Sequence, residues 1–311
     1  MKKILFILLF SLILLTGCVT PGEQNQNPVT AELTLIAPSG TPSLGLATYI
    51  KENMERSEIV AGSDPLVSAF TNATHDIIVA PVNLGAKLYK ANGNYIHYRT
   101  FVWGNTYIAS KSPLSNIQDL EGKAITAFGQ SSTPGIVLKA ILKHYNINVE
   151  VTYVDDVATA NSLLMSGQAE IILTAEPSLS KINANGSLSV IDLQAVWADM
   201  TNSTSYPQAA IFVKKSVYLD TNKKAALLKL DEAIGLTNDA NLVASAAVEI
   251  DTTFNKLGVE VLKRAIPNCH YGLVDNEKDP IETYFNILSD LGLSAMYGGT
   301  LPDEGFYAGN N

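Results

Sequence analysis

The sequence predicts an α/β protein with two similar lobes and a cleft between them. Short apolar runs alternate with amphipathic stretches, as strands and helices do in α/β proteins, and two different segments each occur twice. The first repeated segment is LIAPSGTP at 35–42 and ITAFGQSSTP at 125–134. In each copy a threonine suited to cap a helix precedes a proline suited to its first turn. Each copy therefore predicts a strand, a polar turn and a helix N-terminus with free backbone N–H groups.

The second repeated segment is DIIVAPVNL at 76–84 and EIILTAEPSL at 170–179. The threonines of the first repeat lie 92 positions apart, and the acidic residues that open the second lie 94 apart. Two consecutive units of nearly equal length imply two lobes. The alternative is that strand-turn-helix units resemble one another in any α/β protein.

The N-terminus has the composition of a bacterial export signal. Lys2 and Lys3 precede an apolar run that is too short to span a bilayer comfortably. The sequence LTGC at 15–18 then has the form of a lipobox, so we expect residues 1–17 to be removed and Cys18 to carry a diacylglycerol. The alternative is a cleaved secretory signal with an incidental cysteine.

The polar stretch at 18–31, which contains two prolines, predicts a flexible tether behind the lipidated cysteine. The roughly 280 residues that follow are enough for two packed lobes. The formal charge of the chain is -9, and both charged residues of the leader are lysines, so the mature protein is more acidic still. This charge argues against nucleic acid or anionic lipid as a partner.

Metal and catalytic motifs are not found in the sequence. The four histidines are scattered, without a second ligand at metal-binding spacing, so we expect neither a metal nor a cofactor. Of the two cysteines, a lipidated Cys18 cannot pair, which leaves Cys269 as a small core residue. The glycine-rich phosphate loops and the nucleophile elbow are also missing.

The expected elements follow the two-lobe division in order. The first part of lobe 1, at 32–106, has predicted strands at 33–37, 58–61 and 77–80 and helices at 42–53, 65–70 and 83–91. The aromatic and β-branched stretch at 95–110 predicts an extended segment that crosses between lobes. Lobe 2, at 107–213, has predicted strands at 123–128, 149–154, 171–174, 190–193 and 209–213 and helices at 113–122, 133–146 and 156–165. The segment 214–311 is mainly helical and is expected to return to lobe 1, with helices at 223–235, 241–250, 258–265 and 279–291.

Polar and aromatic side chains near the predicted strand ends form the candidate ligand site. They offer hydrogen bonds without a nucleophile and base pair, which is the chemistry of recognition. The set is Ser39, Gly40, Thr41, Asn83, Gln130, Ser131, Ser132, Thr133, Glu176, Tyr206 and Gln208. Helix capping is the alternative role for Thr41 and Thr133.

Glu176 of this set and Trp103 outside it each allow two interpretations. A carboxylate at Glu176, directly after a buried strand, needs a partner, which is either a cationic or N–H-bearing ligand or a neighbouring donor such as a helix N-terminus. Trp103, Tyr107 and Tyr206 are candidates to contact an apolar part of a ligand, although Trp103 suits the core equally well.

In order along the chain, the lipobox and six short segments resemble the solute-binding lipoproteins of ABC importers. These segments are APSGTP at 37–42, IIVAPVNL at 77–84, TAFGQSSTP at 126–134, AEP at 175–177, SYPQA at 205–209 and LPDEGFY at 301–307. The resemblance covers almost all of the mature chain and is strongest to the sulfonate/nitrate/taurine and thiamine-pyrimidine precursor group. It implies a type II periplasmic-binding fold that closes like a hinge on a small solute.

By this resemblance, two crossing segments lie near 102–107 and 207–214, and the helix-start loops at 39–42 and 130–134 face each other across the cleft. The resemblance also implies a monomer on the extracytoplasmic face of the membrane that delivers its solute to an ABC permease. Because Glu176 opposes a bare anion, a neutral, zwitterionic or amine-bearing heterocycle is favoured, and taurine-like zwitterions remain allowed.

Two other functions are considered. An enzyme of the same fold acting on a small heterocyclic metabolite needs a base or a lysine in the cleft, and the predicted cleft loops contain no lysine. The cysteine-rich motif of the related pyrimidine-forming enzymes is also absent. A surface adhesin would need repeats or a stalk, and neither is present. We therefore expect a binding protein and not an enzyme.

Overall fold

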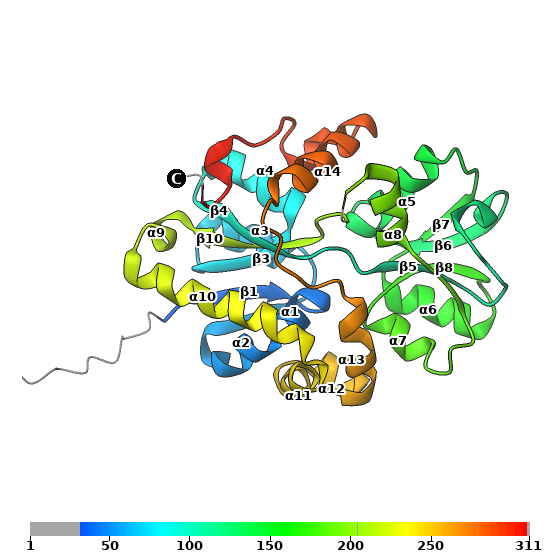
Figure 1. Ribbon diagram of the computed structural model, residues 1–311, viewed down its shortest axis with the longest axis horizontal. Coiled ribbons are helices and arrows are strands. Elements are labelled where there is room, and N and C mark those ends of the chain that lie inside the picture. Colours follow the sequence, from blue (N-terminus) through cyan, green and yellow to red (C-terminus); the bar gives the residue numbers. More distant parts are fainter. Residues whose placement is uncertain (1–31, 204, 310–311) are drawn as a thin grey trace, which may run out of the picture.

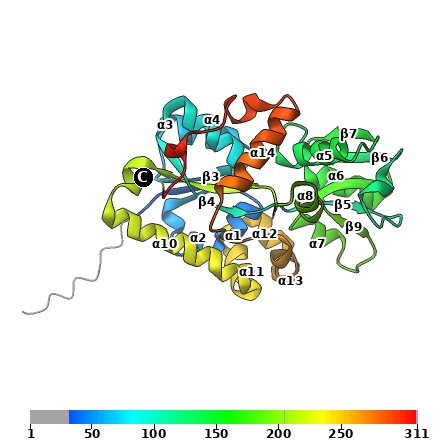
Figure 2. The same cartoon turned by 45° about the horizontal axis from the view of Figure 1, so that its top comes forward.

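The computed structural model describes residues 32–203 and 205–309. The expected signal peptide, the tether and Cys18 lie outside the described residues. Within them the chain forms two five-stranded sheets, sheet A and sheet B, each covered by helices on both faces (Figure 1). Seen after a 45° turn, the two lobes remain separate bodies joined through extended segments (Figure 2).

Sheet A belongs to the first lobe and has the strand order β2-β1-β3-β10-β4. Its strands are β1 (Leu35–Pro38), β2 (Ser57–Val60), β3 (Ile77–Pro81), β4 (Tyr95–Val102) and β10 (Ala209–Lys214). Strands β2, β1 and β3 are parallel, whereas β10 runs antiparallel to both β3 and β4. Strands β1, β2, β3 and β4 therefore share one direction, as the sequence predicts for a largely parallel sheet.

Sheet B belongs to the second lobe and repeats this plan in the order β7-β6-β8-β5-β9. Its strands are β5 (Thr106–Ser110), β6 (Ala124–Phe128), β7 (Glu150–Val154), β8 (Ile171–Ala175) and β9 (Ser189–Asp192). Here β5 is the one strand that runs against the others. In each sheet the reversed strand is the one that has just crossed from the other lobe.

Helices follow the strands of each lobe. Those of the first lobe are α1 (Thr41–Gly45), α2 (Ala47–Glu52), α3 (Asp64–Asn72) and α4 (Val82–Asn92), with the short 3-10 helix η1 (Met54–Arg56); the label η marks 3-10 helices throughout. Those of the second lobe are α5 (Thr133–His144), α6 (Val157–Ser166), α7 (Ser178–Ile182) and α8 (Leu193–Thr201), with η2 (Ile117–Leu120). The C-terminal part adds α9 (Lys215–Tyr218), α10 (Thr221–Gly235), α11 (Ala240–Ile250), α12 (Thr252–Leu257), α13 (Val259–Ala265) and α14 (Lys278–Asp290), with η3 (Leu236–Asn238), η4 (Ile266–Asn268), η5 (Ser294–Tyr297) and η6 (Glu304–Phe306).

Two sequence predictions about elements are wrong. The helix expected at 42–53 is broken into α1 and α2, because Leu46 leaves the helical conformation with φ -109° and ψ 16°. The strand expected in lobe 2 at 209–213 is β10, which pairs with β3 and β4 in sheet A. A fully buried apolar strand has the same residue pattern in either sheet, so only the pairing reveals its lobe. Residues 205–208 therefore belong to the second crossing, which ends before β10 and so lies earlier than expected.

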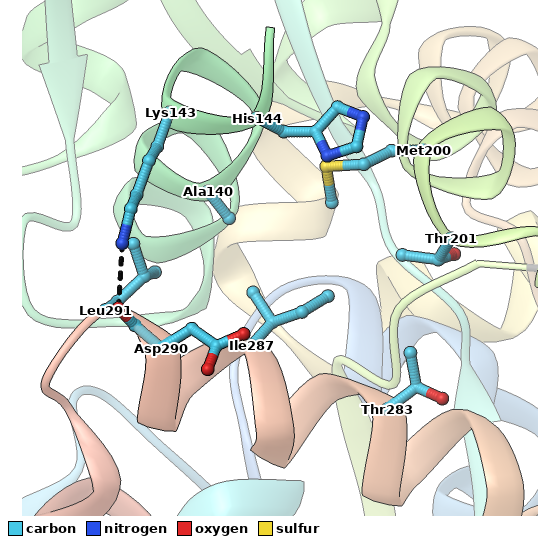
Figure 3. Close-up of a pocket in the computed structure, with 9 residues that line it drawn as sticks. All are labelled: Ala140, Lys143, His144, Met200, Thr201, Thr283, Ile287, Asp290 and Leu291. Atoms are coloured by element: carbon cyan, nitrogen blue, oxygen red, sulfur yellow. Dashed lines mark hydrogen bonds between the residues drawn. The ribbon is translucent and has the colours of Figure 1, made fainter. Parts of the chain in front are cut away.

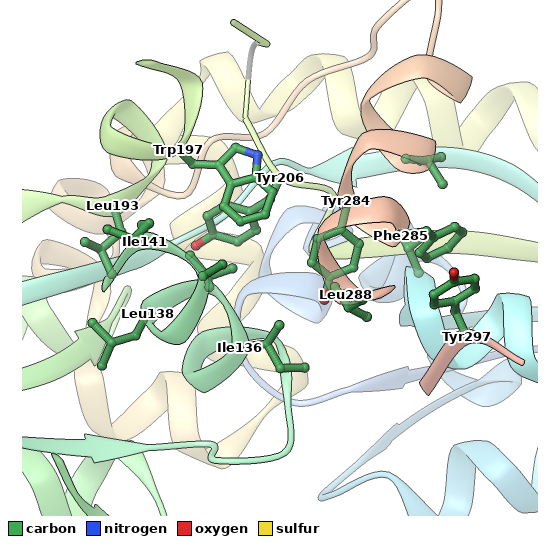
Figure 4. Packing of buried hydrophobic residues seen from close by; sticks show 14 of the residues in the cluster. Ile136, Leu138, Ile141, Leu193, Trp197, Tyr206, Tyr284, Phe285, Leu288 and Tyr297 are labelled. Carbon is green, nitrogen blue, oxygen red and sulfur yellow. The ribbon is translucent and has the colours of Figure 1, made fainter. Parts of the chain in front are cut away.

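Helix α14 joins the hydrophobic cores of the two lobes. Its buried Tyr284 and Phe285 belong to one apolar cluster with Ile136 of α5 and Trp197 of α8 (Figure 4). The rings of Tyr284 and Trp197 lie 6.0 Å apart between centroids. The C-terminal helices thus pack on the first lobe, as the sequence predicts, but α14 also contacts the second.

Gly85 provides a test of how tightly α4 packs on sheet A. A Cβ atom at this position would lie 2.0 Å from the ring of Phe212 on β10. Gly235 of α10 is different, because a Cβ atom there would have none of the described atoms within 4 Å. Gly85→Ala is therefore expected to lower the free energy of unfolding by about 1–3 kcal/mol through overpacking. Gly235→Ala, the matched control, is expected to leave it unchanged or raise it by up to about 1 kcal/mol. Urea unfolding measures both, and equal stability of the two variants would contradict the packing.

Candidate functional site

The carboxyl ends of β1 and β8 meet in the centre of the molecule. The Thr41 hydroxyl, directly after β1, donates a hydrogen bond of 3.0 Å to the main-chain carbonyl of Glu176, directly after β8. The Asn105 side-chain amide, between the lobes, donates to the same carbonyl at 3.1 Å and to the Thr41 hydroxyl. All three residues are buried. The lobes are therefore in direct contact at this point.

The Glu176 carboxylate is satisfied by its own helix. Its two oxygens accept hydrogen bonds from the Ser180 main-chain N–H at 3.0 Å and from the Ser180 hydroxyl at 2.8 Å, in the first turn of α7. Burial raises the pKa of Glu176, and these two hydrogen bonds oppose the rise. Of the two roles left open by the sequence, the neighbouring helix donor is the one observed.

Thr133 opens α5 on the other side of the interlobe contact. It is buried, and its hydroxyl lies near that of Tyr284, the α14 residue that reaches across from the first lobe (Figure 4). Burial raises the pKa of Tyr284, and the Thr133 hydroxyl opposes that rise. Nevertheless, among the described residues, none meets hydrogen-bond geometry with the Tyr284 hydroxyl. A buried polar atom without a well-formed hydrogen bond is rare and costs free energy, so this hydroxyl is a candidate partner for a ligand or a water.

Tyr206, expected in the ligand site, is instead part of the hinge. Its side chain is fully buried, and its hydroxyl donates a hydrogen bond of 2.6 Å to the Gln194 side-chain oxygen while bonding the Thr106 hydroxyl. The same Gln194 oxygen accepts from the Thr106 main-chain N–H at 2.8 Å. Gly104 lies against this group, since a Cβ there would be 2.5 Å from Gln194. Both crossing segments are thus held side by side by buried polar groups.

A third segment, at 268–272, leaves η4 and runs along the first crossing. Trp103 donates from its main chain to the His270 carbonyl at 3.0 Å and from its ring to the Gly272 carbonyl at 3.1 Å. Trp103 is 5% exposed, so its core role is the one observed. In Figure 1 this segment passes between α13 and α14, beside the strands that join the lobes.

Tyr107 connects sheet B to this third segment. Its hydroxyl donates to the Asn268 carbonyl at 2.6 Å and lies 3.1 Å from the His270 ring nitrogen Nε2. The same nitrogen is 3.5 Å from the Asp192 carboxylate of the second lobe, and His270 lowers the pKa of Asp192 against the effect of burial. The Tyr107 hydroxyl is therefore occupied by contacts within the protein.

The remaining predicted site residues lie on either side of the contact. The exposed Ser39 donates to the Asp251 carboxylate at 2.6 Å, and the neighbouring Gly40 has a φ of 114°. Asn83 is buried and directs its amide toward the Met296 carbonyl at 3.5 Å. Gln130, Ser131 and Ser132 are exposed in the turn before α5. Within the described ranges no hydrogen bond joins this turn to the turn at 39–42, so their facing arrangement stays a prediction.

Three buried polar atoms between the lobes are without a hydrogen-bond partner in the described part of the chain. They are the side-chain oxygens of Asn105 and Gln208 and the hydroxyl of Tyr284. The orientation of the Asn105 amide follows from its N–H bond to the Glu176 carbonyl, which leaves its oxygen as an acceptor. Asn105 and Tyr284 are not among the residues predicted from the sequence, since an Asn in an extended segment and a Tyr on a helix carry no distinguishing pattern.

A cavity of about 410 Å³ opens at the outer edge of the interlobe contact, where α14 faces α5 and α8 (Figure 3). Lys143 of α5 donates across its floor to the Asp290 carbonyl of α14 at 2.8 Å. Its lining includes His144, Met200 and Ile287. None of the predicted ligand residues lines it, so this cavity is peripheral to the predicted site.

Residues 32–203 and 205–309 contain neither a metal site nor a membrane span. These residues contain no group of three or more His, Cys, Asp or Glu side chains that would hold a metal ion. They also contain no helix that is long and apolar enough to cross a membrane.

Comparison with solved structures identifies the fold. An ABC transporter protein from Parabacteroides distasonis aligns with a TM-score of 0.74 and 19% identity over 89% of this chain and 99% of that chain. The chain has the periplasmic-binding-protein fold. The periplasmic aliphatic sulphonate-binding protein SsuA from Escherichia coli aligns with a TM-score of 0.64 and 13% identity, covering 88% and 93% of the two chains.

The same periplasmic-binding fold occurs in the ligand-binding component of an ABC-type import system from Staphylococcus aureus, with a TM-score of 0.63 and 13% identity over 88% of this chain and 95% of that one. No model of a known protein family matches the sequence, and no curated protein matches it either. At these identities the likeness concerns the fold, and the fold class expected from the sequence is confirmed.

Tyr206→Phe tests the hinge network. Removing the hydroxyl breaks its buried hydrogen bonds to Gln194 and Thr106, so we expect the free energy of unfolding to fall by about 1–3 kcal/mol. Tyr145→Phe is the matched control, because that hydroxyl bonds the exposed Asp199 and its loss should change stability by no more than about 0.5 kcal/mol. Guanidinium unfolding distinguishes them, and equal effects would contradict a structural role for Tyr206.

Proposed function

We propose that this protein is the extracytoplasmic solute-binding component of an ABC importer, which captures a small organic solute between its lobes and delivers it to a membrane permease. The observation that carries the proposal is the meeting of β1 and β8 at their carboxyl ends, through Thr41, Glu176 and Asn105. In open α/β sheets, ligands bind at the carboxyl ends of strands. Two such edges that meet across a hinge form a site that closing completes.

The unpartnered atoms of the interlobe contact favour a solute that carries hydrogen-bond donors. The Asn105 and Gln208 oxygens are acceptors, and the Tyr284 hydroxyl serves as acceptor or donor. An amine, an amide or a ring N–H satisfies such groups, whereas a bare sulfonate presents acceptors alone. We therefore propose an amine-bearing solute, of the heterocyclic vitamin-precursor or taurine-like type.

The anchor is also part of the proposal. The lipobox at 15–18 supports a lipid on Cys18, and the polar stretch at 18–31 supports a tether that leaves the folded lobes free to reach a permease. Tyr206 is no longer proposed as a ligand residue, since its buried hydroxyl belongs to the hinge. Thr41, Thr133 and Asn83 remain in the proposed site together with Asn105, Gln208 and Tyr284.

The first experiment identifies the solute. Native mass spectrometry of the purified protein is expected to show a bound small molecule, and X-ray scattering is expected to show a more compact particle with that molecule than without it. A bound molecule that leaves the particle dimensions unchanged would argue against capture by hinge closure. Chemical conversion of the molecule by the pure protein would instead indicate an enzyme of the same fold.

The chemical class of the solute is tested with a pair that differs only in an amine. Calorimetry with taurine and with ethanesulfonate is expected to give at least tenfold tighter binding of taurine if the amine meets the unpartnered oxygens. An aminopyrimidine serves as the heterocyclic alternative. Tighter binding of ethanesulfonate than of either amine would show that anion recognition at the helix N-termini dominates.

Tyr284→Phe tests the site itself. Because none of the described residues bonds this hydroxyl, its removal is expected to leave the stability of the solute-free protein unchanged or slightly increased. Solute affinity, in contrast, is expected to fall about fivefold to tenfold, the loss of one hydrogen bond of about 1–1.5 kcal/mol. Tyr153→Phe on β7 is the control for both measurements. A destabilised variant with unchanged affinity would place the solute elsewhere.

A further inference from the structure

A polar cavity of about 300 Å³ lies in the first lobe, away from the interlobe contact. Its lining comes from β4, from the segment that leads into α14, and from the C-terminal residues around η6. Those residues are His97, Tyr98, Arg99, Asp275, Asn276, Glu277, Lys278, Glu304, Tyr307 and Ala308. Neither the sequence repeats nor the proposed solute site includes any of them.

Two of the lining side chains are buried and incompletely bonded. Glu277 is 7% exposed; one of its carboxylate oxygens accepts from the Thr100 main-chain N–H, and the other is without a partner among the described residues. The hydroxyl of Tyr307, a residue 5% exposed, is likewise unbonded there. Buried polar atoms are normally satisfied, so two unbonded oxygens in one cavity point to an occupant.

The charges around the cavity define what the occupant must offer. Lys278 is paired with Glu304 and lies 3.9 Å from Glu282, and Arg99 lies 3.9 Å from Asp231 on α10. His97 stays uncharged near neutral pH, because burial lowers its pKa to about 3. Burial raises the pKa of Glu277, and the charge of Arg99 lowers it. The lining nevertheless carries three carboxylates, those of Asp275, Glu277 and Glu304, against the two cations Arg99 and Lys278, which leaves an excess of negative charge.

We propose that this cavity is a second ligand site, which holds a small primary ammonium cation between the Glu277 carboxylate and the Tyr307 hydroxyl. An ammonium group has three N–H donors and a positive charge, which satisfies both oxygens and compensates the buried carboxylate. The Tyr307 ring adds an aromatic wall next to His97, whose ring centroid is 5.9 Å away.

The position of this site connects it to both lobes. Glu277 directly precedes α14, and Tyr284 of that helix contacts Trp197 of the second lobe. The Glu277 carboxylate also accepts a hydrogen bond from the main chain of Thr100 in β4, the strand that leads into the first crossing. Because the cation binds the folded protein and not the unfolded chain, its occupancy raises the stability of this junction.

The probe is methylammonium chloride, titrated calorimetrically into the full chain purified in detergent. Tetramethylammonium has the same charge but no N–H donor, so we expect it to bind at least tenfold more weakly, and sodium chloride at equal ionic strength to give no binding heat.

Burial raises the pKa of Glu277 to about 7, so the carboxylate is more fully ionised at pH 8 than at pH 6. Methylammonium is therefore expected to bind several-fold more tightly at pH 8.

Two conservative variants locate the binding. Glu277→Gln removes the charge, and Tyr307→Phe removes the hydroxyl while keeping the ring; we expect at least tenfold and at least threefold weaker methylammonium binding, respectively. Glu277→Gln should also abolish the difference between pH 6 and pH 8. Glu55→Gln, an exposed acidic residue on η1, is the matched control and should bind like the parent. Circular dichroism confirms that each variant is folded, and Tyr307→Phe tests the site even if Glu277→Gln does not fold.

Three results would overturn the proposal. They are no measurable methylammonium binding at pH 8, equal binding of tetramethylammonium, or unchanged binding in Tyr307→Phe and Glu277→Gln. The first would mean that water satisfies the two oxygens, and the other two would mean that the heat reflects general ionic effects. None of these results bears on solute capture between the lobes, which the taurine and scattering measurements test separately.

Discussion

The two segments that cross between the lobes lie side by side, and several of their buried polar groups bond each other or a shared partner. Tyr206 of the second crossing shares the Gln194 oxygen with the main chain of Thr106 in the first, and Ser205 donates to the Trp103 carbonyl at 2.7 Å. Separating these segments would expose or orphan several hydrogen-bonding groups at once. The pair therefore behaves as one element, about which the two lobes are arranged.

This arrangement explains why the carboxyl ends of the strands meet where they do. Each sheet receives one reversed strand from the crossings, β10 in sheet A and β5 in sheet B, which fixes the edge that each lobe presents to the other. Asn105 then lies between Thr41 and Glu176 and bonds both. Contacts that join the lobes are polar at this point and apolar where α14 meets α5 and α8. A polar centre with unsatisfied atoms beside an apolar flank suits a site that opens and closes.

The Glu277 cavity differs from this centre in chemistry. The interlobe atoms are neutral amide and phenol groups, whereas the cavity contains a buried carboxylate next to compensated cations. A neutral or zwitterionic solute suits the first, and a small cation suits the second. Helix α14 contacts both places, through Tyr284 and through the residue that precedes it.

The repeated segments at 35–42 and 125–134 were sufficient to predict two α/β lobes, because caps, prolines and apolar runs act locally and determine strands and helix starts wherever they occur. The same local rules located the starts of α1 and α5 but were wrong about their caps: Gly40 and Ser132 are the N-cap residues, and Thr41 and Thr133 are the first residues of the helices. They did not place β10 in sheet A or Tyr206 in the hinge, since a buried strand and a buried tyrosine look alike in every core. Asn105, Tyr284 and Glu277 acquired their significance only through folding, because whether a polar atom lacks a partner depends on every chain segment that packs around it.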